Sequence, residues 1–272
     1  MRVPFIKMHG LGNDFVVLDT RVDRIPAMTN ALAAVLADRK TGIGCDQLIL
    51  LEPSQVADLR MRIFNADGGE VEACGNATRA VGLLSGAQTR IETVAGILAT
   101  DPVDGGIAVD MGKPRFGWEE IPLAYAMDTL TMPVGWEALE APAGVNVGNP
   151  HAVFFVADTL AIDLSRLGPL IEHDPLFPDR VNVNVATVTA RDAISLRVWE
   201  RGVGETRACG TGACATAIAA MRRDYCDHRV VVTLTGGPLQ IEWTDEGRIV
   251  MTGPAAESFR GTFDPAHYGA TL

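Results

Sequence analysis

Two cysteines occupy matching places in two similar stretches of the sequence, EVEACGNATRAVGLLSG at 70–86 and ETRACGTGACATAIAAM at 205–221. In each stretch an Ala-Cys-Gly triplet and a small polar residue lead into a run that favours a helix. Cys74 and Cys209 are therefore predicted to stand at helix N-termini. The first backbone N–H groups of a helix have no partner within it, so they can bind an anion and favour the thiolate form of a nearby cysteine.

Two thiols of this kind could act as an acid–base pair on one carbon atom. If one thiolate removed a hydrogen next to a carboxylate and the opposite thiol returned a proton, the configuration of that carbon would invert. Charge would build on the carboxylate, and the amides of both helix ends would stabilise it. His151 and Glu200 are polar residues that could tune the pKa values of the two thiols. The residues expected to supply the amides are Gly75, Asn76, Gly210 and Thr211.

Other uses of the cysteines explain less of the sequence. A cysteine hydrolase needs one cysteine and a histidine base, such as His9, His151 or His173, and leaves the second Cys-Gly motif unexplained. Cys209 and Cys214 have no histidine close by in the sequence, so no metal site is expected. The glycine-rich turns lack the pattern of a phosphate or dinucleotide loop, so no nucleotide is expected.

The similarity between the two halves of the chain extends beyond the cysteines, at an offset of 135 or 136 residues. Because several short matches share an offset of half the chain length, we interpret the chain as two copies of one duplicated unit. The matched segments are 61–64 with 196–199, Gly12-Asn13 with Gly148-Asn149, and Gln47 with Asn182.

The elements that carry the cysteines are predicted to be many short strands and one long helix in each half. Apolar runs bounded by turn residues predict the strands, and further helices are expected near 31–38 and 164–172. The expected fold class is α+β, with two pseudosymmetric lobes, each a curled, mostly antiparallel, barrel-like sheet around a central helix. The N-terminal lobe is expected to span 1–115, with the tail 259–272 packing back on it, and the C-terminal lobe 116–258.

The charge and hydropathy of the chain argue against several classes of partner. The formal net charge is −11 and the pI about 4.9, without a cluster of Lys and Arg, so nucleic acid is not an expected partner. No apolar run is long enough to span a bilayer and the N-terminus lacks a signal-peptide pattern, so no membrane association is expected. The five cysteines, an odd number, fit thiols in a reducing compartment.

Further polar residues precede or adjoin apolar strands at matching places in both halves. An amide in a turn is often structural, but the matching positions favour a role in binding a ligand. Glu200 and Arg201 could pair with an ammonium and a carboxylate, since arginine binds a carboxylate through two parallel hydrogen bonds. The candidates of this kind are Asn13, Gln47, Asn65, Asn149, Asn182, Glu200 and Arg201.

Several words of the sequence resemble those of diaminopimelate epimerases. The resemblance runs from the first ten residues to 253–255, nearly the whole chain. The related proline racemases and hydroxyproline epimerases have Cys-Gly-His where this chain has Cys-Gly-Asn at 74–76. The words are HGLGNDF (9–15), FNADG (64–68), ACGNATR (73–79), GNPHAV (148–153), VNVN (181–184), ERGVGET (200–206) and ACGTGACA (208–215).

The resemblance implies a cytoplasmic enzyme that interconverts LL- and meso-diaminopimelate for lysine and peptidoglycan precursor synthesis, without pyridoxal phosphate or a metal. It implies that Cys74 and Cys209 are the acid–base pair, that His151 and Glu200 tune them, and that the enzyme is a homodimer. The substrate contacts implied are Asn13, Gln47, Asn65, Gly75, Asn76, Asn149, Asn182, Glu200, Arg201, Gly210 and Thr211.

Two alternatives to this hypothesis stay open. One is a racemase or isomerase of the same fold that acts on another amino acid. The other is a non-catalytic protein that holds an anion or an amino acid at its helix ends.

Overall fold

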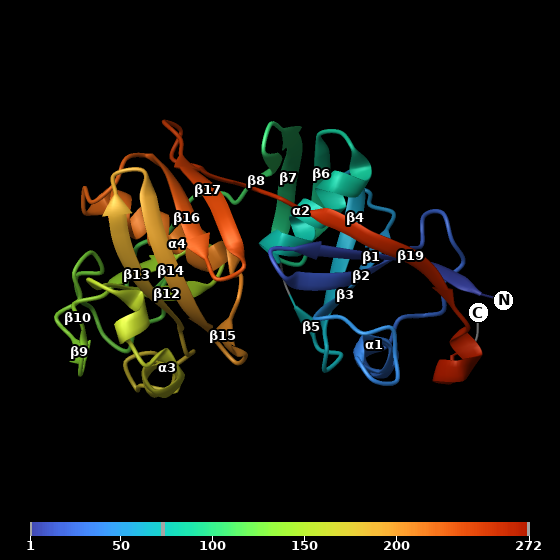
Figure 1. The fold of residues 1–272 in the computed structure, drawn as a ribbon, viewed down its shortest axis with the longest axis horizontal. Helices are drawn as coiled ribbons and strands as arrows, with labels where there is room; N and C mark the ends of the chain where they lie inside the picture. Colours follow the sequence, from blue (N-terminus) through green and yellow to red (C-terminus); the bar gives the residue numbers. More distant parts are fainter. Residues whose placement is uncertain (1, 72–73, 271–272) are drawn as a thin grey trace. The chain divides into compact units, whose positions relative to one another are not determined.

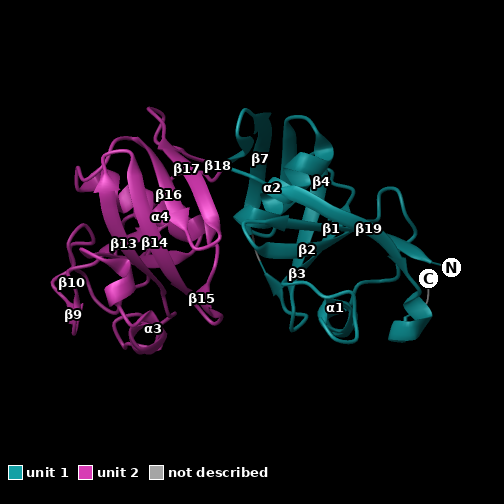
Figure 2. Ribbon diagram, in the orientation of Figure 1, with its two compact units in different colours: residues 1–109, 253–272 teal, residues 110–252 magenta. Residues whose placement is uncertain are grey.

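The structure is a computed structural model that describes residues 2–71 and 74–270. It divides into two compact units (Figure 2): unit 1 comprises residues 1–109 and 253–272, and unit 2 comprises residues 110–252. The sequence places the division at 115/116 and 258/259, whereas the contacts of the chain divide it at 109/110 and 252/253. Ala73, the first residue of the ACGNATR motif, and the last two residues of the tail lie outside the described residues.

Unit 1 is a curled sheet with one helix on each of its faces (Figure 1). Its strands are β1 (Val3–Gly10), β2 (Asn13–Asp19), β3 (Gln47–Glu52), β4 (Leu59–Asn65), β5 (Glu70–Val71), β6 (Thr89–Thr93), β7 (Gly96–Val103), β8 (Gly106–Asp110) and β19 (Ala256–Phe263), and its helices are α1 (Asn30–Ala37) and α2 (Gly75–Ser85). The pairs β2–β3 and β4–β6 are parallel, and the pairs β1–β19, β1–β2, β3–β4, β4–β5 and β6–β7 are antiparallel. Helix α2 contacts β1, β6, β7 and β19, while α1 contacts β3 and β4.

Unit 2 repeats this arrangement around its own helix. Its main strands are β11 (Ala143–Asn146), β12 (Pro150–Phe155), β13 (Asn182–Ala190), β14 (Ala193–Glu200), β15 (Gly204–Thr206), β16 (Arg229–Leu234), β17 (Gly237–Trp243) and β18 (Ile249–Gly253), and its helices are α3 (Leu164–Glu172) and α4 (Gly210–Arg222). The pairs β12–β13 and β14–β16 are parallel, and the pairs β11–β12, β13–β14, β14–β15, β16–β17 and β17–β18 are antiparallel. Helix α4 contacts six of these strands, so the sheet curls around it.

The two units share their strand registers as well as their element order. In the parallel pair β2–β3, Phe15 stands opposite Gln47, and in the parallel pair β12–β13, His151 stands opposite Asn182. These positions differ by the offsets of 136 and 135 residues that the sequence shows between its halves. The prediction of two pseudosymmetric α+β lobes is therefore confirmed.

An ion pair is repeated at the same offset. Arg62 of β4 pairs with Glu70 of β5 at 2.8 Å, and Arg197 of β14 pairs with Glu205 of β15 at 2.8 Å. In each unit this pair joins the two strands that precede the cysteine helix, so it holds the hairpin that leads into that helix.

The sheet of unit 1 is covered on both faces, which explains why its strands read as continuous apolar runs. Along β2, Phe15 and Val17 belong to the core under α2, while Val16 and Leu18 belong to the core under α1. Because successive side chains of a strand point to opposite faces, the strand needs apolar residues at every position.

The two cysteine helices are buried along most of their length, and small residues allow this. In α2 a Cβ at Gly82 would lie 2.8 Å from Ile107 and 2.9 Å from Thr100, so a larger residue would push the helix away from the strands. In α4 the residues from Gly212 to Met221 are all buried, and most of them are alanine or another small residue.

The helices expected near 31–38 and 164–172 are present as α1 and α3. Two strands were not predicted, β1 and β19, which pair with each other from opposite ends of the sequence. Residues 112–134 form no helix or strand, as their prolines and glycines indicate, and a short hairpin of β9 (Gly135–Trp136) and β10 (Leu139–Glu140) follows.

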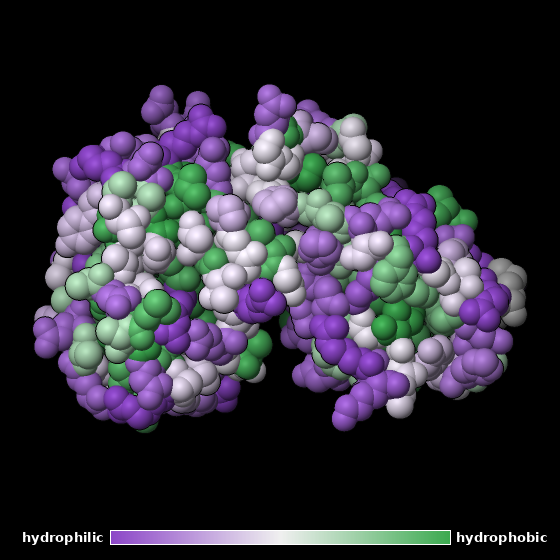
Figure 3. All heavy atoms as spheres, viewed as in Figure 1, coloured by the Kyte–Doolittle hydropathy of each residue, from purple (hydrophilic) through white to green (hydrophobic). Residues whose placement is uncertain are grey.

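The part of the chain that the structure describes holds no helix with the length and apolar character needed to cross a membrane. On the face drawn in Figure 3, hydrophilic residues predominate and hydrophobic residues appear in patches between them.

Candidate active site

Unit 1 places Cys74 at the start of its buried helix, as predicted. Cys74 is the N-cap residue of α2 and has an extended backbone, with φ −147° and ψ 113°. Its carbonyl oxygen accepts hydrogen bonds from the backbone N–H and the hydroxyl of Thr78, both at 2.9 Å, which closes the first turn. Gly75 and Asn76 occupy the first helical positions, where N–H groups point out of the helix end.

Amide side chains surround the thiol of Cys74. The thiol is partly exposed, and its Sγ lies 3.8 Å from Oδ1 of Asn13. The same oxygen of Asn13 accepts a hydrogen bond from Nδ2 of Asn76 at 3.2 Å. Oδ1 of Asn76 in turn accepts one from Nη2 of the fully buried Arg79 at 2.8 Å, so the orientation of the Asn76 amide is fixed.

Gln47 and Asn65 stand opposite each other on β3 and β4. Nε2 of Gln47 donates a hydrogen bond to Oδ1 of Asn65 at 3.0 Å. Oε1 of Gln47 is buried and has no hydrogen-bond partner among the described residues. A buried oxygen without a donor costs about 1–3 kcal/mol, so Gln47 offers an acceptor to an N–H group of a ligand.

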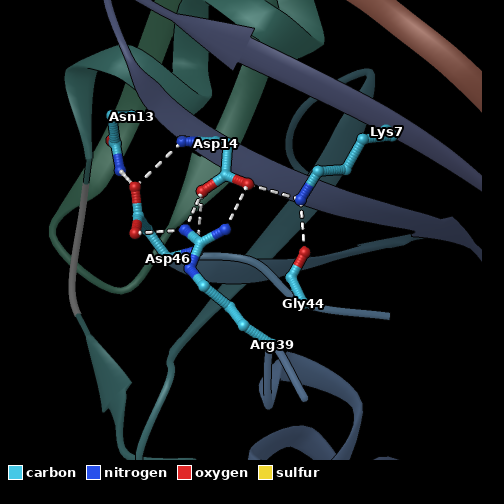
Figure 4. A network of polar contacts seen from close by, with 6 residues as sticks. All are labelled: Lys7, Asn13, Asp14, Arg39, Gly44 and Asp46. Carbon is cyan, nitrogen blue, oxygen red and sulfur yellow. Dashed lines mark hydrogen bonds and ion pairs between the residues drawn. The ribbon is translucent and has the colours of Figure 1, made fainter. Parts of the chain in front are cut away.

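A cluster of charged side chains lies on the other side of Asn13 (Figure 4). Nδ2 of Asn13 donates a hydrogen bond to Asp46 at 3.1 Å, and Arg39 pairs with Asp46 and with Asp14. Lys7 forms a further ion pair with Asp14. The sequence analysis missed this cluster, although Asp46 stands in the GIGCDQ segment directly before β3.

Unit 2 places Cys209 in the same way, as the N-cap residue of α4, with φ −130° and ψ 108°. Its side chain is buried, and Sγ accepts a hydrogen bond from the backbone N–H of Gly212 at 3.3 Å. The hydroxyl of Thr211 lies 3.5 Å from the sulfur. A Cβ at position 212 would lie 3.2 Å from the sulfur and 3.0 Å from Val198, so this close approach requires glycine.

The electrostatics at Cys209 correct one expectation. Burial raises the pKa of the Cys209 thiol well above its ordinary value, and the negative charge of Glu200 adds to the rise. The hydrogen bonds from Thr211 and Gly212 lower the pKa but do not offset the burial. The prediction that the helix end favours the thiolate is therefore wrong for Cys209, because removing the sulfur from water outweighs the helix N–H groups.

Glu200 is the carboxyl group closest in role to this thiol. It ends β14, shares a hydrogen bond with Cys209 and accepts another from the hydroxyl of Thr206. Burial raises the pKa of Glu200, and these two hydrogen bonds lower it in part. A carboxylate with a raised pKa is a stronger base than usual, so Glu200 is suited to exchange a proton with the thiol.

His151 lies in the interior of unit 2 and is fully buried. Burial lowers its pKa to about 4, so the ring is neutral at pH 7. Nδ1 lies 3.2 Å from Oδ1 of Asn184, whose Nδ2 donates to the carbonyl oxygen of Gly212 at 2.9 Å and to Thr216 at 3.0 Å. Because the carbonyl of Gly212 can only accept, the amide of Asn184 cannot turn, and its oxygen holds the ring proton of His151 on Nδ1.

The other ring nitrogen of His151 faces Asn149. Nε2 lies 3.0 Å from Oδ1 of this amide. A neutral ring with its proton on Nδ1 cannot donate to that oxygen, and a second proton is disfavoured by burial. The contact is satisfied when the Asn149 amide turns its nitrogen toward the ring, since the two ends of an amide have the same shape.

Asn182 and Arg201 join the ends of β13 and β14. Oδ1 of Asn182 accepts a hydrogen bond from the backbone N–H of Arg201 at 2.9 Å, and its Nδ2 donates to the carbonyl oxygen of Pro150 at 2.8 Å. The guanidinium of Arg201 is exposed and donates to the carbonyl oxygen of Asp179 at 3.0 Å. It is therefore accessible to an anionic ligand.

Each unit thus gathers the residues that the sequence predicted for its half. Around Cys74 these are Asn13, Gly75 and Asn76, with the pair of Gln47 and Asn65 on the neighbouring strands. Around Cys209 these are Glu200, Gly210 and Thr211, and the network of Asn149, His151 and Asn182 lies in the same unit. His151 forms hydrogen bonds with Asn149 and Asn184, and its connection to the Cys209 helix runs through Asn184.

The sequence gave a signal for Asn184, the second asparagine of the VNVN word, but no role. Asn182 and Asn184 lie two residues apart on β13, so they face the same side of the strand. Among the described residues, no group of three or more His, Cys, Asp or Glu side chains is arranged to hold a metal ion.

Comparison with other proteins groups the chain with one family. The family model described as "Diaminopimelate epimerase" matches residues 5–117 and 144–257, one segment in each half. A diaminopimelate epimerase of Erythrobacter litoralis is 69% identical over 98% of this chain and 100% of its own length. One from Rhizorhabdus wittichii is 65% identical over 99% of this chain and 98% of its own length.

A solved structure described as a probable proline racemase from Agrobacterium radiobacter K84 has the same fold. It matches with a TM-score of 0.68 over 99% of this chain and 96% of its own, at 17% sequence identity.

Proposed function

This chain belongs to the diaminopimelate epimerase family, and on that premise we propose that it interconverts LL- and meso-diaminopimelate by inverting one α-carbon. The relatives that carry this name are 65–69% identical to it over nearly their full lengths. The substrate is then a small amino acid with two carboxylates and two ammonium groups.

One observation carries the proposal. In each unit a cysteine is the N-cap residue of a buried helix, at positions that the duplication makes equivalent. A helix end that presents both a thiol and N–H groups can hold a carboxylate and reach the carbon next to it. Two such ends, one from each unit, supply what inversion requires: one group that removes a proton and another that returns one.

We assign Cys74 and Cys209 as this acid–base pair. In one direction the thiolate of one cysteine removes the α-hydrogen, and the thiol of the other delivers a proton to the opposite face; in the reverse direction the two exchange roles. The N–H groups of Gly75 and Asn76, and those of Gly210 and Thr211, stabilise the charge that develops on the carboxylate.

Glu200 prepares Cys209 for this reaction. The buried thiol holds its proton when no other group takes it, because burial raises its pKa. Glu200 shares a hydrogen bond with that thiol and has a raised pKa itself, so a proton can pass between them at modest cost. His151 stays neutral and acts through Asn149 and Asn184 on the surroundings of the second helix.

The polar side chains around the thiols fit the charges of this substrate. The buried oxygen of Gln47 and the carboxylate of Glu200 are acceptors for an ammonium group. The exposed guanidinium of Arg201 is a donor for the distant carboxylate. The amides of Asn13, Asn65, Asn149 and Asn182 complete the set of contacts that we propose.

We further propose that the enzyme works in the cytoplasm as a homodimer, without a cofactor or a metal. The two thiols and the helix N–H groups account for both proton transfers and for the charge on the carboxylate. Proton transfer to carbon therefore needs no added electron sink in this mechanism.

The proposal is tested by isotope exchange in D2O with pure LL-diaminopimelate. The wild type should form the meso isomer and place deuterium at the inverted carbon, and Cys74→Ala and Cys209→Ala should each abolish inversion. Cys226→Ala is the matched control, because this buried cysteine lies outside both sets of site residues and should leave the rate unchanged.

The same assay separates the alternatives. A binding protein would take up diaminopimelate without exchanging its α-hydrogen. A racemase of the same fold with another substrate would exchange proline-like or other amino acids and leave diaminopimelate unlabelled. Either result would contradict the proposed function, as would full inversion by a single-cysteine variant.

A further inference from the structure

Four charged side chains form a closed cluster beside Asn13 in unit 1 (Figure 4). Lys7 comes from β1, Asp14 from β2, and Arg39 and Asp46 from the segment between α1 and β3. Arg39 pairs with both carboxylates, and Lys7 pairs with Asp14. Two positive and two negative formal charges meet, so the cluster is balanced without any other group.

The cluster is joined to the backbone as well. Oδ1 of Asp14 accepts a hydrogen bond from the backbone N–H of Asp46 at 3.0 Å. Oδ2 of Asp46 accepts one from the backbone N–H of Asp14 at 3.1 Å. Lys7 also donates to the carbonyl oxygen of Gly44. These reciprocal bonds fix Asp46 against the start of β2.

Burial of Asp14 would raise its pKa, but the hydrogen bonds from Arg39 and Lys7 outweigh this, and the pKa falls well below its usual range. Asp14 therefore stays ionised at neutral pH and keeps both cations in place. The position of Asp46 depends on Arg39 in the same way, through an ion pair at 2.7 Å.

The remaining contact of Asp46 reaches the candidate site. The same oxygen, Oδ2, accepts a hydrogen bond from Nδ2 of Asn13 at 3.1 Å. Because an ionised carboxylate can only accept, the nitrogen end of the Asn13 amide must face Asp46. The oxygen end then faces Nδ2 of Asn76 at 3.2 Å and Sγ of Cys74 at 3.8 Å.

The equivalent position in unit 2 is held by different chemistry. Asn149 corresponds to Asn13 at the offset of 136 residues, and its amide faces the ring of His151. The residue of unit 1 that corresponds to His151 is Phe15, which has no polar atom to hold an amide. In unit 1 this task therefore falls to a side chain from elsewhere, and Asp46 is the one that contacts Asn13.

We propose that Asp46 is a positioning residue of the reaction: held by Arg39 and Asp14, it fixes the Asn13 amide so that its oxygen faces Cys74 and the substrate. An acceptor at that place binds the thiol proton or the ammonium group next to the reacting carbon. This inference rests on the proposed function, since it gives Asn13 a task in that reaction.

A double-mutant cycle separates positioning from a merely structural role. The variants are Asp46→Ala, Asn13→Ala and the two combined, assayed for kcat/KM with diaminopimelate. Asp46→Ala should lower kcat/KM about 10- to 100-fold, the usual effect of losing a hydrogen bond to a charged group. In the Asn13→Ala background the same substitution should cost less than about twofold, because Asp46 then has no amide left to orient.

Two further variants sharpen the result. Asp46→Asn keeps an oxygen within reach of Asn13 and should retain kcat/KM within about threefold of the wild type, whereas a role in charge balance alone predicts a loss as large as that of Asp46→Ala. Glu257→Ala breaks an exposed ion pair with Arg260 in the same unit and should change nothing. If Asp46→Ala does not fold, Asp46→Ser replaces it, because its short side chain cannot reach Asn13.

The outcomes are distinct. Equal losses from Asp46→Ala with and without Asn13 would overturn the inference and leave the proposed function standing. A wild type that fails to invert diaminopimelate would overturn the proposed function itself. A loss confined to the Asn13 background with the amide present, with thermal unfolding unchanged, supports the positioning role.

Discussion

Acid should destabilise this protein through His151, by an amount that follows from its burial. Burial lowers the pKa of the ring from 6.5 to about 4 in the folded state. In the unfolded chain the ring is exposed and keeps its ordinary pKa of about 6.5. Between these two values the unfolded state binds one more proton than the folded state, so the free energy of unfolding falls as the pH falls. At 1.36 kcal/mol for each pKa unit, the loss is about 3 kcal/mol on reaching pH 4.

Urea unfolding from pH 7.5 to pH 4 measures this loss against the variant His151→Gln. Glutamine can still donate to Asn184 but gains no proton, so the variant loses only the part that the carboxyl groups cause. The wild type should therefore lose about 3 kcal/mol more than the variant over this range. Equal losses would refute the reasoning, and would mean that the oxygens of Asn149 and Asn184 already hold a protonated ring in the folded state.

Other expected outcomes follow from single contacts. Asn184→Leu keeps the volume but leaves the buried Nδ1–H of the histidine without an acceptor, so urea unfolding should show a loss of about 2–4 kcal/mol; a change below about 0.5 kcal/mol would contradict the assigned hydrogen bonds. Glu200→Gln removes the charge that raises the pKa of Cys209, so the limb of the pH–rate profile that reports this thiol should move to lower pH, and a shift to higher pH would count against the contact. Gly82→Ala gains about 1 kcal/mol of helix propensity but places a Cβ 2.8 Å from its neighbours, an overpacking cost of about 1–3 kcal/mol, so thermal unfolding should occur at an equal or lower temperature than in the wild type. A mild oxidant should abolish inversion and a reductant should restore it, whereas full activity after exhaustive oxidation would argue against two thiols acting at one carbon.

The helices and most strands could be predicted because their signals are local. Thr29 caps α1 as the sequence indicates, and apolar runs such as Phe15 to Leu18 lie within the strands that were predicted. The two strands that were missed, β1 and β19, pair across almost the whole chain. No local pattern reports a partner so distant, and β19 has mostly exposed side chains, so it lacks the apolar run that marks a strand.

The candidate site was read from the sequence only as far as the duplication reached. The repeat singled out Cys74, Cys209 and the amide residues at matching places, because each appears twice at one offset. Residues with no counterpart in the other half escaped it. Asp46 has valine at its matching position, and the ion cluster around it therefore left no repeated signal.

The sequence by itself determined that two equivalent helices begin at cysteines, since helix propensity and capping depend on neighbours along the chain. Only the tertiary structure decided the state of the groups around them. The thiol of Cys209 keeps its proton because the surrounding fold removes it from water, and His151 is neutral for the same reason. Desolvation and hydrogen-bond direction depend on which distant side chains meet, and the sequence does not list those meetings.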